Sequence, residues 1–186
     1  MGSSYWQNPI VFLVQIAFML YILAVMLRFL LQLVRADAFN PLAQFLLRVT
    51  EPVLRPLRRL IPGTRRFDTA SVVFMYVLEF ASLEAVLAIR GMTGMAPTPY
   101  LLLAALVNVV VLLLNLYLFT ILIQVILSWV SPGAYNPALS VLYSINEPLL
   151  EQARRLIPPL GGIDFSPLLV LVAIEVIKML IAPFGT

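Results

Sequence analysis

The sequence predicts an all-α membrane protein in which four transmembrane helices form two parallel repeats. Each repeat consists of a span, an amphipathic segment and a second span. Two observations lead to this fold class. Of the 186 residues, 62% are hydrophobic and only 11% are charged, whereas soluble domains are about half apolar and a quarter charged. In addition, one series of motifs occurs twice, at a spacing of 96 residues.

Four apolar segments account for the spans. They cover approximately residues 10–34, 69–89, 100–130 and 166–183. Each is close to or above the ~20 residues that a helix needs to cross the hydrocarbon layer. Because lipid offers no hydrogen-bond partners, only helices or closed barrels satisfy the backbone there, and runs of this length exclude barrel strands.

The repeat aligns without a gap and defines the organisation of the chain. We expect a first repeat at 9–90, an extracytoplasmic linker with the start of the third span at 91–104, and a second repeat at 105–186. Each repeat crosses the membrane an even number of times, so both have the same orientation. The matching residues are Asn40-Pro41 with Asn136-Pro137, Glu51-Pro52 with Glu147-Pro148, Arg58-Arg59 with Arg154-Arg155, Asp68 with Asp164, and Glu79 with Glu175.

The distribution of arginine predicts the orientation. Seven arginines lie between the first and second spans, and two lie between the third and fourth, whereas the N-terminal tail has no Lys or Arg. The positive-inside bias places both arginine-bearing connections in the cytoplasm. Both termini and the loop between the repeats are then expected outside it.

Each cytoplasmic connection is expected to form two short helices, joined at Thr50-Glu51 or at Asn146-Glu147. Thr50 and Asn146 are good N-cap residues, and the Asn-Pro pair that opens each connection is typical of a helix start. After Thr50, apolar residues such as Leu54 and Leu57 share one side and the arginines share the other. Such helices either lie flat in the headgroup region or dip into the bilayer and return.

The charged residues of the connections allow two interpretations. Five arginines are candidates for binding anionic lipid or a partner protein, because juxtamembrane arginines are attracted to an anionic leaflet. They are Arg55, Arg58, Arg59, Arg154 and Arg155. Alternatively, the repeated residues form a structural network that fixes the connections to the spans. That network would comprise Asn40, Pro41, Glu51, Pro52, Asp68, Asn136, Pro137, Glu147, Pro148, Asp164 and Ser166.

Charged residues also occur within the spans, where a charge costs at least ~2.5–3.5 kcal/mol. Glu79 and Glu175 lie about ten residues into the second and fourth spans, near the expected midplane. They are either part of an ion or proton relay, or structural, as neutral carboxyl groups or as carboxylates paired with a neighbour. Arg28 is a possible partner for Glu79, although Gln124 replaces it in the second repeat, and Lys178 is one turn from Glu175.

The composition excludes most familiar active sites. The chain has no cysteine and no histidine, so it lacks thiolate nucleophiles, thiolate or imidazole metal ligands and histidine bases. No glycine-rich phosphate loop or nucleic-acid module is recognisable. We therefore expect a protein that is not an enzyme and that uses no cofactor or metal, with the lipid bilayer rather than nucleic acid as its partner.

The repeated motifs resemble those of the YggT family of small membrane proteins. They are Asn-Pro, Glu-Pro eleven residues on, Arg-Arg-Leu-Ile-Pro, and an Asp that opens the next span. The run "IPPLGGIDFSP" at 157–167 is especially similar, and the first repeat departs from it with "PGTRRFDTAS" at 62–71. If this stretch has a binding role, the second repeat is therefore the better candidate.

The resemblance implies a bacterial inner-membrane protein linked to osmotic-stress tolerance and to envelope and division organisation. Plastid relatives are linked to nucleoid distribution and cytochrome-complex assembly. The expected function is that of a non-catalytic membrane organiser or assembly factor, with anionic lipid, a membrane-protein partner or a second copy as its ligand. The alternative is a small oligomeric ion or solute transporter that uses Glu79 and Glu175.

Overall fold

The computed structural model describes residues 3–37, 39–64, 67–130, 137–157 and 164–185. These residues form helices and connecting turns, and no β-strand occurs among them. The elements are α1 (Ser3–Leu33), α2 (Pro41–Leu60), α3 (Thr69–Ile89), α4 (Thr98–Val130), α5 (Pro137–Leu156), α6 (Ser166–Ile181) and the short 3₁₀ helix η1 (Ala182–Phe184).

Four of these helices are long and apolar enough to cross a membrane. The qualifying segments are Trp6–Leu33, Thr69–Ile89, Thr98–Ser128 and Ser166–Phe184, which belong to α1, α3, α4 and the α6–η1 unit. The protein is therefore a multi-pass membrane protein, as its composition predicts. α2 and α5 lie between the spans of each repeat and are called the connecting helices below.

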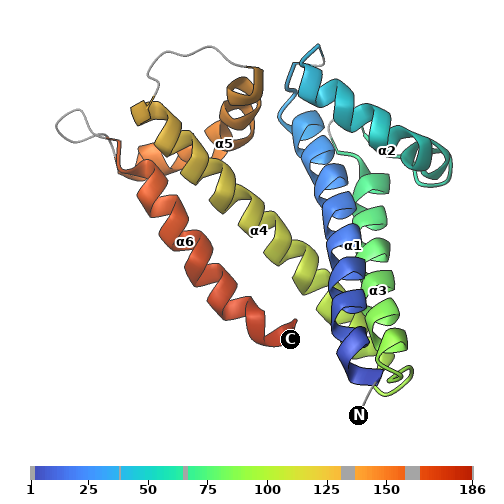
Figure 1. The fold of residues 1–186 in the computed structure, drawn as a ribbon. Coiled ribbons are helices and arrows are strands. Elements are labelled where there is room, and N and C mark those ends of the chain that lie inside the picture. Colours follow the sequence, from blue (N-terminus) through green and yellow to red (C-terminus); the bar gives the residue numbers. More distant parts are fainter. Residues whose placement is uncertain (1–2, 38, 65–66, 131–136, 158–163, 186) are drawn as a thin grey trace.

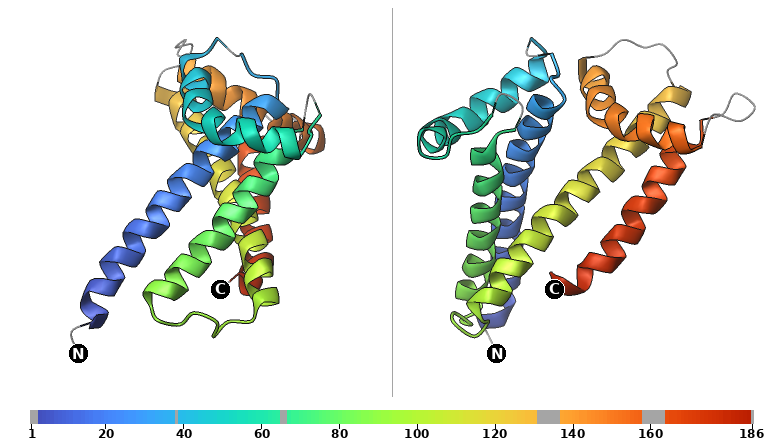
Figure 2. Two further views of the ribbon diagram at one scale, coloured as in Figure 1. Left: turned by 90° about the vertical axis from the view of Figure 1, so that its right-hand side faces the viewer. Right: turned by 180° about the vertical axis from the view of Figure 1, so that it is seen from behind.

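The two repeats point in the same direction. Both connecting helices lie at one end of the molecule, whereas the start of α1, the α3–α4 loop and the end of α6 lie at the other (Figure 1). α4 runs diagonally through the molecule (Figure 2). The beginning of α4 packs against α3, and the rest of α4 extends towards α5 and α6. The predicted fold class, with two parallel hairpins, is confirmed.

The expectation of two short helices in each connection is wrong, because α2 and α5 are each continuous over 20 residues. Thr50 does not act as an N-cap. Its hydroxyl donates instead to the Leu46 carbonyl at 2.6 Å, a bond typical of threonine within a helix. Pro52 and Pro56 are both exposed and, being four residues apart, lie on one side of α2.

Each connecting helix packs against its own spans through a strip of buried apolar residues. In α2, Ala43, Leu46 and Leu54 are buried in the cluster that also holds the α1 residues Ile22 and Met26. In α5, Leu150 and Ala153 are buried with residues of α4 and α6. The connecting helices are thus packed parts of the fold.

Candidate functional site: the connecting helices and a polar groove

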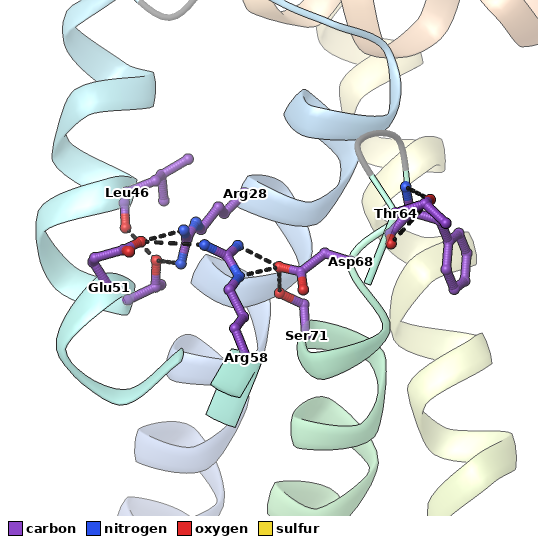
Figure 3. A network of polar contacts seen from close by, with 9 residues as sticks. Arg28, Leu46, Glu51, Arg58, Thr64, Asp68 and Ser71 are labelled. Carbon is purple, nitrogen blue, oxygen red and sulfur yellow. Dashed lines mark hydrogen bonds and ion pairs between the residues drawn. The ribbon is translucent and has the colours of Figure 1, made fainter. Parts of the chain in front are cut away.

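A network of charged side chains joins α2 to both spans of the first repeat (Figure 3). Arg28 of α1 donates to Thr50 Oγ1 at 3.1 Å and forms an ion pair with Glu51, both on α2. Arg58 of α2 donates from Nε to Asp68 Oδ2 at 3.1 Å, and Asp68 directly precedes α3. Arg58 Nη1 also lies 3.5 Å from Glu51 Oε2. Four charges of alternating sign therefore tie α2 to α1 and α3.

Asp68 is the most enclosed carboxylate of this network, with only 3% of its surface exposed. Ser71 Oγ donates to its Oδ2 at 2.6 Å, so this carboxylate accepts bonds from two side chains. Burial raises the pKa of Asp68, but the hydrogen bonds from Arg58 and Ser71 outweigh burial and hold the pKa below its ordinary value. The carboxylate is consequently charged at neutral pH and serves as the anchor of α2.

The second repeat contains a more exposed version of the same arrangement. Arg154 of α5 donates from Nε to Asp164 Oδ2 at 2.9 Å and pairs with Glu147 at 2.5 Å. Asp164 Oδ1 accepts the Ser166 N–H at 2.8 Å, a bond that caps the start of α6. Burial raises the pKa of Asp164, but the hydrogen bonds from Ser166 and Arg154 lower it by more, so the pKa lies below its ordinary value. Ser166 itself is fully buried.

The repeats differ where the first span meets the connecting helix. Gln124 stands in the place of Arg28, and Asn146 stands in the place of Thr50. Asn146 Nδ2 donates to Gln124 Oε1 at 2.8 Å, and both residues are buried. The two positions have changed together, so the second repeat keeps a bond between span and connecting helix without a buried cation.

Asn40 links the two repeats at this end of the molecule. Its Oδ1 accepts the Leu42 N–H at 2.9 Å and caps α2, which begins at Pro41. Its Nδ2 donates to the Pro137 carbonyl of α5 at 2.7 Å. Asn136, the expected counterpart of Asn40, lies outside the described residues, as do residues 158–163 of the "IPPLGGIDFSP" run. Pro148, like Pro52, lies within its helix and is exposed.

α2 has three faces that follow its helical period. The first is the buried strip described above, and the second carries the charged residues of the network. The third is apolar but exposed. Phe45 is 60% exposed there and Leu60 79%, and the face also includes Leu42, Val49 and Val53.

The corresponding face of α5 is covered at its start. Val141 and Ile145 stand where α2 has Phe45 and Val49, yet they are buried in the cluster that contains α1 and α2 residues. Residues of the first repeat therefore cover this part of α5, whereas Phe45 and Val49 in the equivalent part of α2 are exposed. This face distinguishes two otherwise similar helices.

Three arginines border the exposed apolar face of α2. Arg48, Arg55 and Arg59 are exposed, and none forms an ion pair or hydrogen bond within the described part of the chain. Their counterparts in α5 are Ser144, Glu151 and Arg155. The Arg155 guanidinium lies 2.8 Å from the Glu151 carboxylate. This side of α2 thus has three free positive charges, whereas the same side of α5 is neutral.

The suggested pair between Arg28 and Glu79 does not form. Arg28 extends towards the connecting helix, as long basic side chains near a span end usually do, and pairs with Glu51. Glu79 Oε1 instead accepts a hydrogen bond from Asn108 Nδ2 of α4 at 2.9 Å. In α6, Lys178 Nζ lies 2.9 Å from Glu175 Oε1.

A groove of about 550 Å³ lies between α1, α3 and α4 and is open to the surface; its lining is mainly apolar, and it is called the polar groove below for the polar side chains among that lining. Its walls combine apolar side chains with five polar ones, which are Gln15, Glu79, Ser82, Asn108 and Asn115. Of these five, the sequence singled out only Glu79 as a candidate, and it gave no reason to group Glu79 with the others. Ser82 was missed, because a serine within an apolar helix is an ordinary residue.

The family comparison agrees with this architecture. A sequence profile of the CCB3/YggT family matches residues 7–89 and 103–184. The chain belongs to this family. An uncharacterized protein of Pseudomonas aeruginosa is 43% identical over 171 residues, which cover 92% of this chain and 87% of that protein. The YggT protein of Escherichia coli is 35% identical over 176 residues, covering 95% and 90%.

The two matched segments of this CCB3/YggT protein each contain a span, a connecting helix and a second span. A further relative, ycf19 of Guillardia theta, is 34% identical over 73 residues, which cover 80% of that protein but 39% of this chain. That relative is therefore comparable in size to one repeat. No solved structure matches the chain.

Proposed function

We propose that this CCB3/YggT protein is a non-catalytic organiser of the bacterial inner membrane that gathers anionic phospholipid against α2. The exposed apolar face of α2, with Arg48, Arg55 and Arg59 along its border, is the observation that carries the proposal. Such a face suits a helix that lies in the headgroup region, with apolar side chains towards the acyl chains and guanidinium groups at the phosphates. The connecting helices then lie on the cytoplasmic side, with the termini outside.

The contacts of the arginines divide the five sequence candidates into two groups. Arg58 and Arg154 are engaged with carboxylates that position the connecting helices, and Arg155 is paired with Glu151. Arg55 and Arg59 have no ion-pair partner in the described part of the chain and are available to a ligand. The same is true of Arg48. We therefore assign lipid binding to α2 and a structural role to Arg58 and Arg154.

Replacing Arg55 and Arg59 together by glutamine is expected to weaken binding of phosphatidylglycerol roughly thirtyfold. The reason is that each arginine near an anionic surface contributes about 1 kcal/mol. Native mass spectrometry of the purified protein, titrated with phosphatidylglycerol or phosphatidylcholine, measures this effect. Arg90→Gln is the matched control, because Arg90 is also exposed but directly follows the end of α3, far along the chain from α2.

The same variants test the organiser role in cells. A strain without the gene is expected to survive osmotic shock less well, with survival restored by the wild-type protein and by Arg90→Gln. The Arg55→Gln/Arg59→Gln variant should restore it poorly. Unchanged survival of the deletion strain, together with unchanged lipid binding in the double variant, would contradict the proposal.

The alternative function, an ion or solute transporter, gains support only from the polar groove around Glu79. The two carboxylates proposed for transport have different surroundings, since Glu175 is paired with Lys178 and Glu79 is bonded to Asn108. Ion flux into proteoliposomes that is lost in Glu79→Gln would favour a transporter over an organiser.

A further inference from the structure

The polar groove contains a carboxyl group that has no partner cation in the described part of the chain. Glu79 lies about ten residues, or ~15 Å, from the start of α3, well within the span. Within the described part of the chain, its carboxyl group accepts a hydrogen bond from the neutral amide of Asn108. An isolated charge at such depth is costly; a bound cation is one way to remove that cost, and a proton on the carboxyl group is the other.

The second repeat shows how the chain neutralises the equivalent carboxylate. Glu175 occupies the position of Glu79, and Lys178, three residues later, places its ammonium group 2.9 Å from it. The first repeat has Ser82 at the position of Lys178, and Ser82 is buried in the wall of the groove. Serine has neither the ammonium group nor the four-carbon side chain of lysine. In the first repeat, the groove lies beside this position.

We propose that the groove binds a small monovalent cation, either an inorganic ion or a primary ammonium group, with Glu79 as its counter-charge. The cation takes the role that the Lys178 ammonium has in the second repeat. Gln15, Ser82 and Asn115 supply side-chain oxygens, the ligand type that hard cations and ammonium groups prefer. This site is separate from the lipid surface of α2 and does not depend on the organiser role.

The thermal stability of the protein in lipid nanodiscs tests the site. Na⁺, K⁺ or methylammonium is added against a background of N-methylglucamine, which is too bulky for close contact with Glu79. At least one small cation is expected to raise the melting temperature by roughly 3 °C or more at saturation. A response to Na⁺ or K⁺ identifies an inorganic ligand, and a response to methylammonium alone identifies an ammonium group.

Four variants make the test specific. Glu79→Gln should abolish the response, whereas Glu175→Gln should retain it. Ser82→Lys should supply an internal ammonium group and remove the response, whereas Ser82→Ala, which removes one ligand oxygen but adds no charge, should weaken the response without abolishing it. The proposal is overturned if no cation stabilises the wild type, or if Glu79→Gln responds as the wild type does.

A chemical measurement covers the case in which a variant fails to fold. Dicyclohexylcarbodiimide modifies protonated carboxyl groups in apolar surroundings, so a cation bound at the carboxylate protects it, and mass spectrometry of the wild-type protein locates the modification. Glu79 is expected to react, with the reaction slowed by the cation that stabilises the protein. A reaction rate at Glu79 that none of the three cations changes would contradict the site.

Discussion

Replacing Asp68 by alanine is expected to lower the free energy of unfolding by about 3 kcal/mol. Asp68 is almost fully buried and accepts bonds from Arg58 and Ser71, so its removal leaves a partly buried guanidinium without its main partner. Losing one member of a buried ion pair typically costs about 3–5 kcal/mol, and the partial exposure of Arg58 places this pair at the lower end. Unfolding in mixed detergent micelles measures the loss.

Asp164→Ala is the matched control in the second repeat. The side chains of Asp164 and Arg154 are 35% and 32% exposed, so water can replace much of this pair. We expect a loss of about 1 kcal/mol. Equal losses at the two positions would show that burial of the network does not determine its contribution.

The same carboxylate gives the stability a defined pH dependence. The pKa of Asp68 is lower in the folded protein than in the unfolded chain, so its contribution is present above the unfolded value and is lost as the pH falls through the folded value. Stability should therefore fall below about pH 4, where an ordinary aspartate starts to protonate. The decrease should be smaller in Asp68→Ala, since the group responsible is absent.

Replacing Arg28 by glutamine is expected to cost about 2–3 kcal/mol, because Glu51 loses a direct ion pair and Thr50 loses a donor. Adding Thr50→Asn should recover about 1 kcal/mol or more. The double variant has the second-repeat residues at these two positions, where Asn146 donates to Gln124 at 2.8 Å, but it lacks a counterpart of Thr120, which donates to Asn146 in the second repeat and is replaced by Ala24 in the first. A double variant that is no more stable than Arg28→Gln alone would show that the two positions are not coupled.

The comparison of Arg28 with Gln124 shows what sequence could and could not predict. Hydropathy and the repeat predicted four spans and two parallel hairpins, because long apolar runs in lipid have few alternatives. Partners of individual charges were harder to predict. The sequence suggested that Arg28 could reach Glu79 in the neighbouring span, but the flexible Arg28 side chain extends to α2 instead. Positions along the chain do not determine which partner such a side chain contacts. The sequence did contain one signal of this contact, because Arg28 and Thr50 both have different residues, Gln124 and Asn146, at the equivalent positions of the second repeat.

The connecting helices illustrate a second limit. Thr50 and the prolines around it favoured a helix break, yet packing of Ala43, Leu46 and Leu54 on the spans holds α2 as one helix. Local preference for a break was outweighed by burial along the full length of the helix. The asymmetry between the exposed Phe45 and the buried Val141 depends on contact between repeats, which the sequence does not reveal.

The orientation of the connecting helices is the claim on which the account depends, and single-cysteine labelling tests it directly. The chain has no cysteine, so Arg55→Cys, Glu151→Cys and Met95→Cys each introduce one reactive thiol. Positions 55 and 151 are equivalent in the repeat, and all three are exposed. With a membrane-impermeant maleimide, positions 55 and 151 should both react only from the cytoplasmic side, and position 95 only from the outside. Labelling of 55 and 151 from opposite sides would contradict the two parallel hairpins.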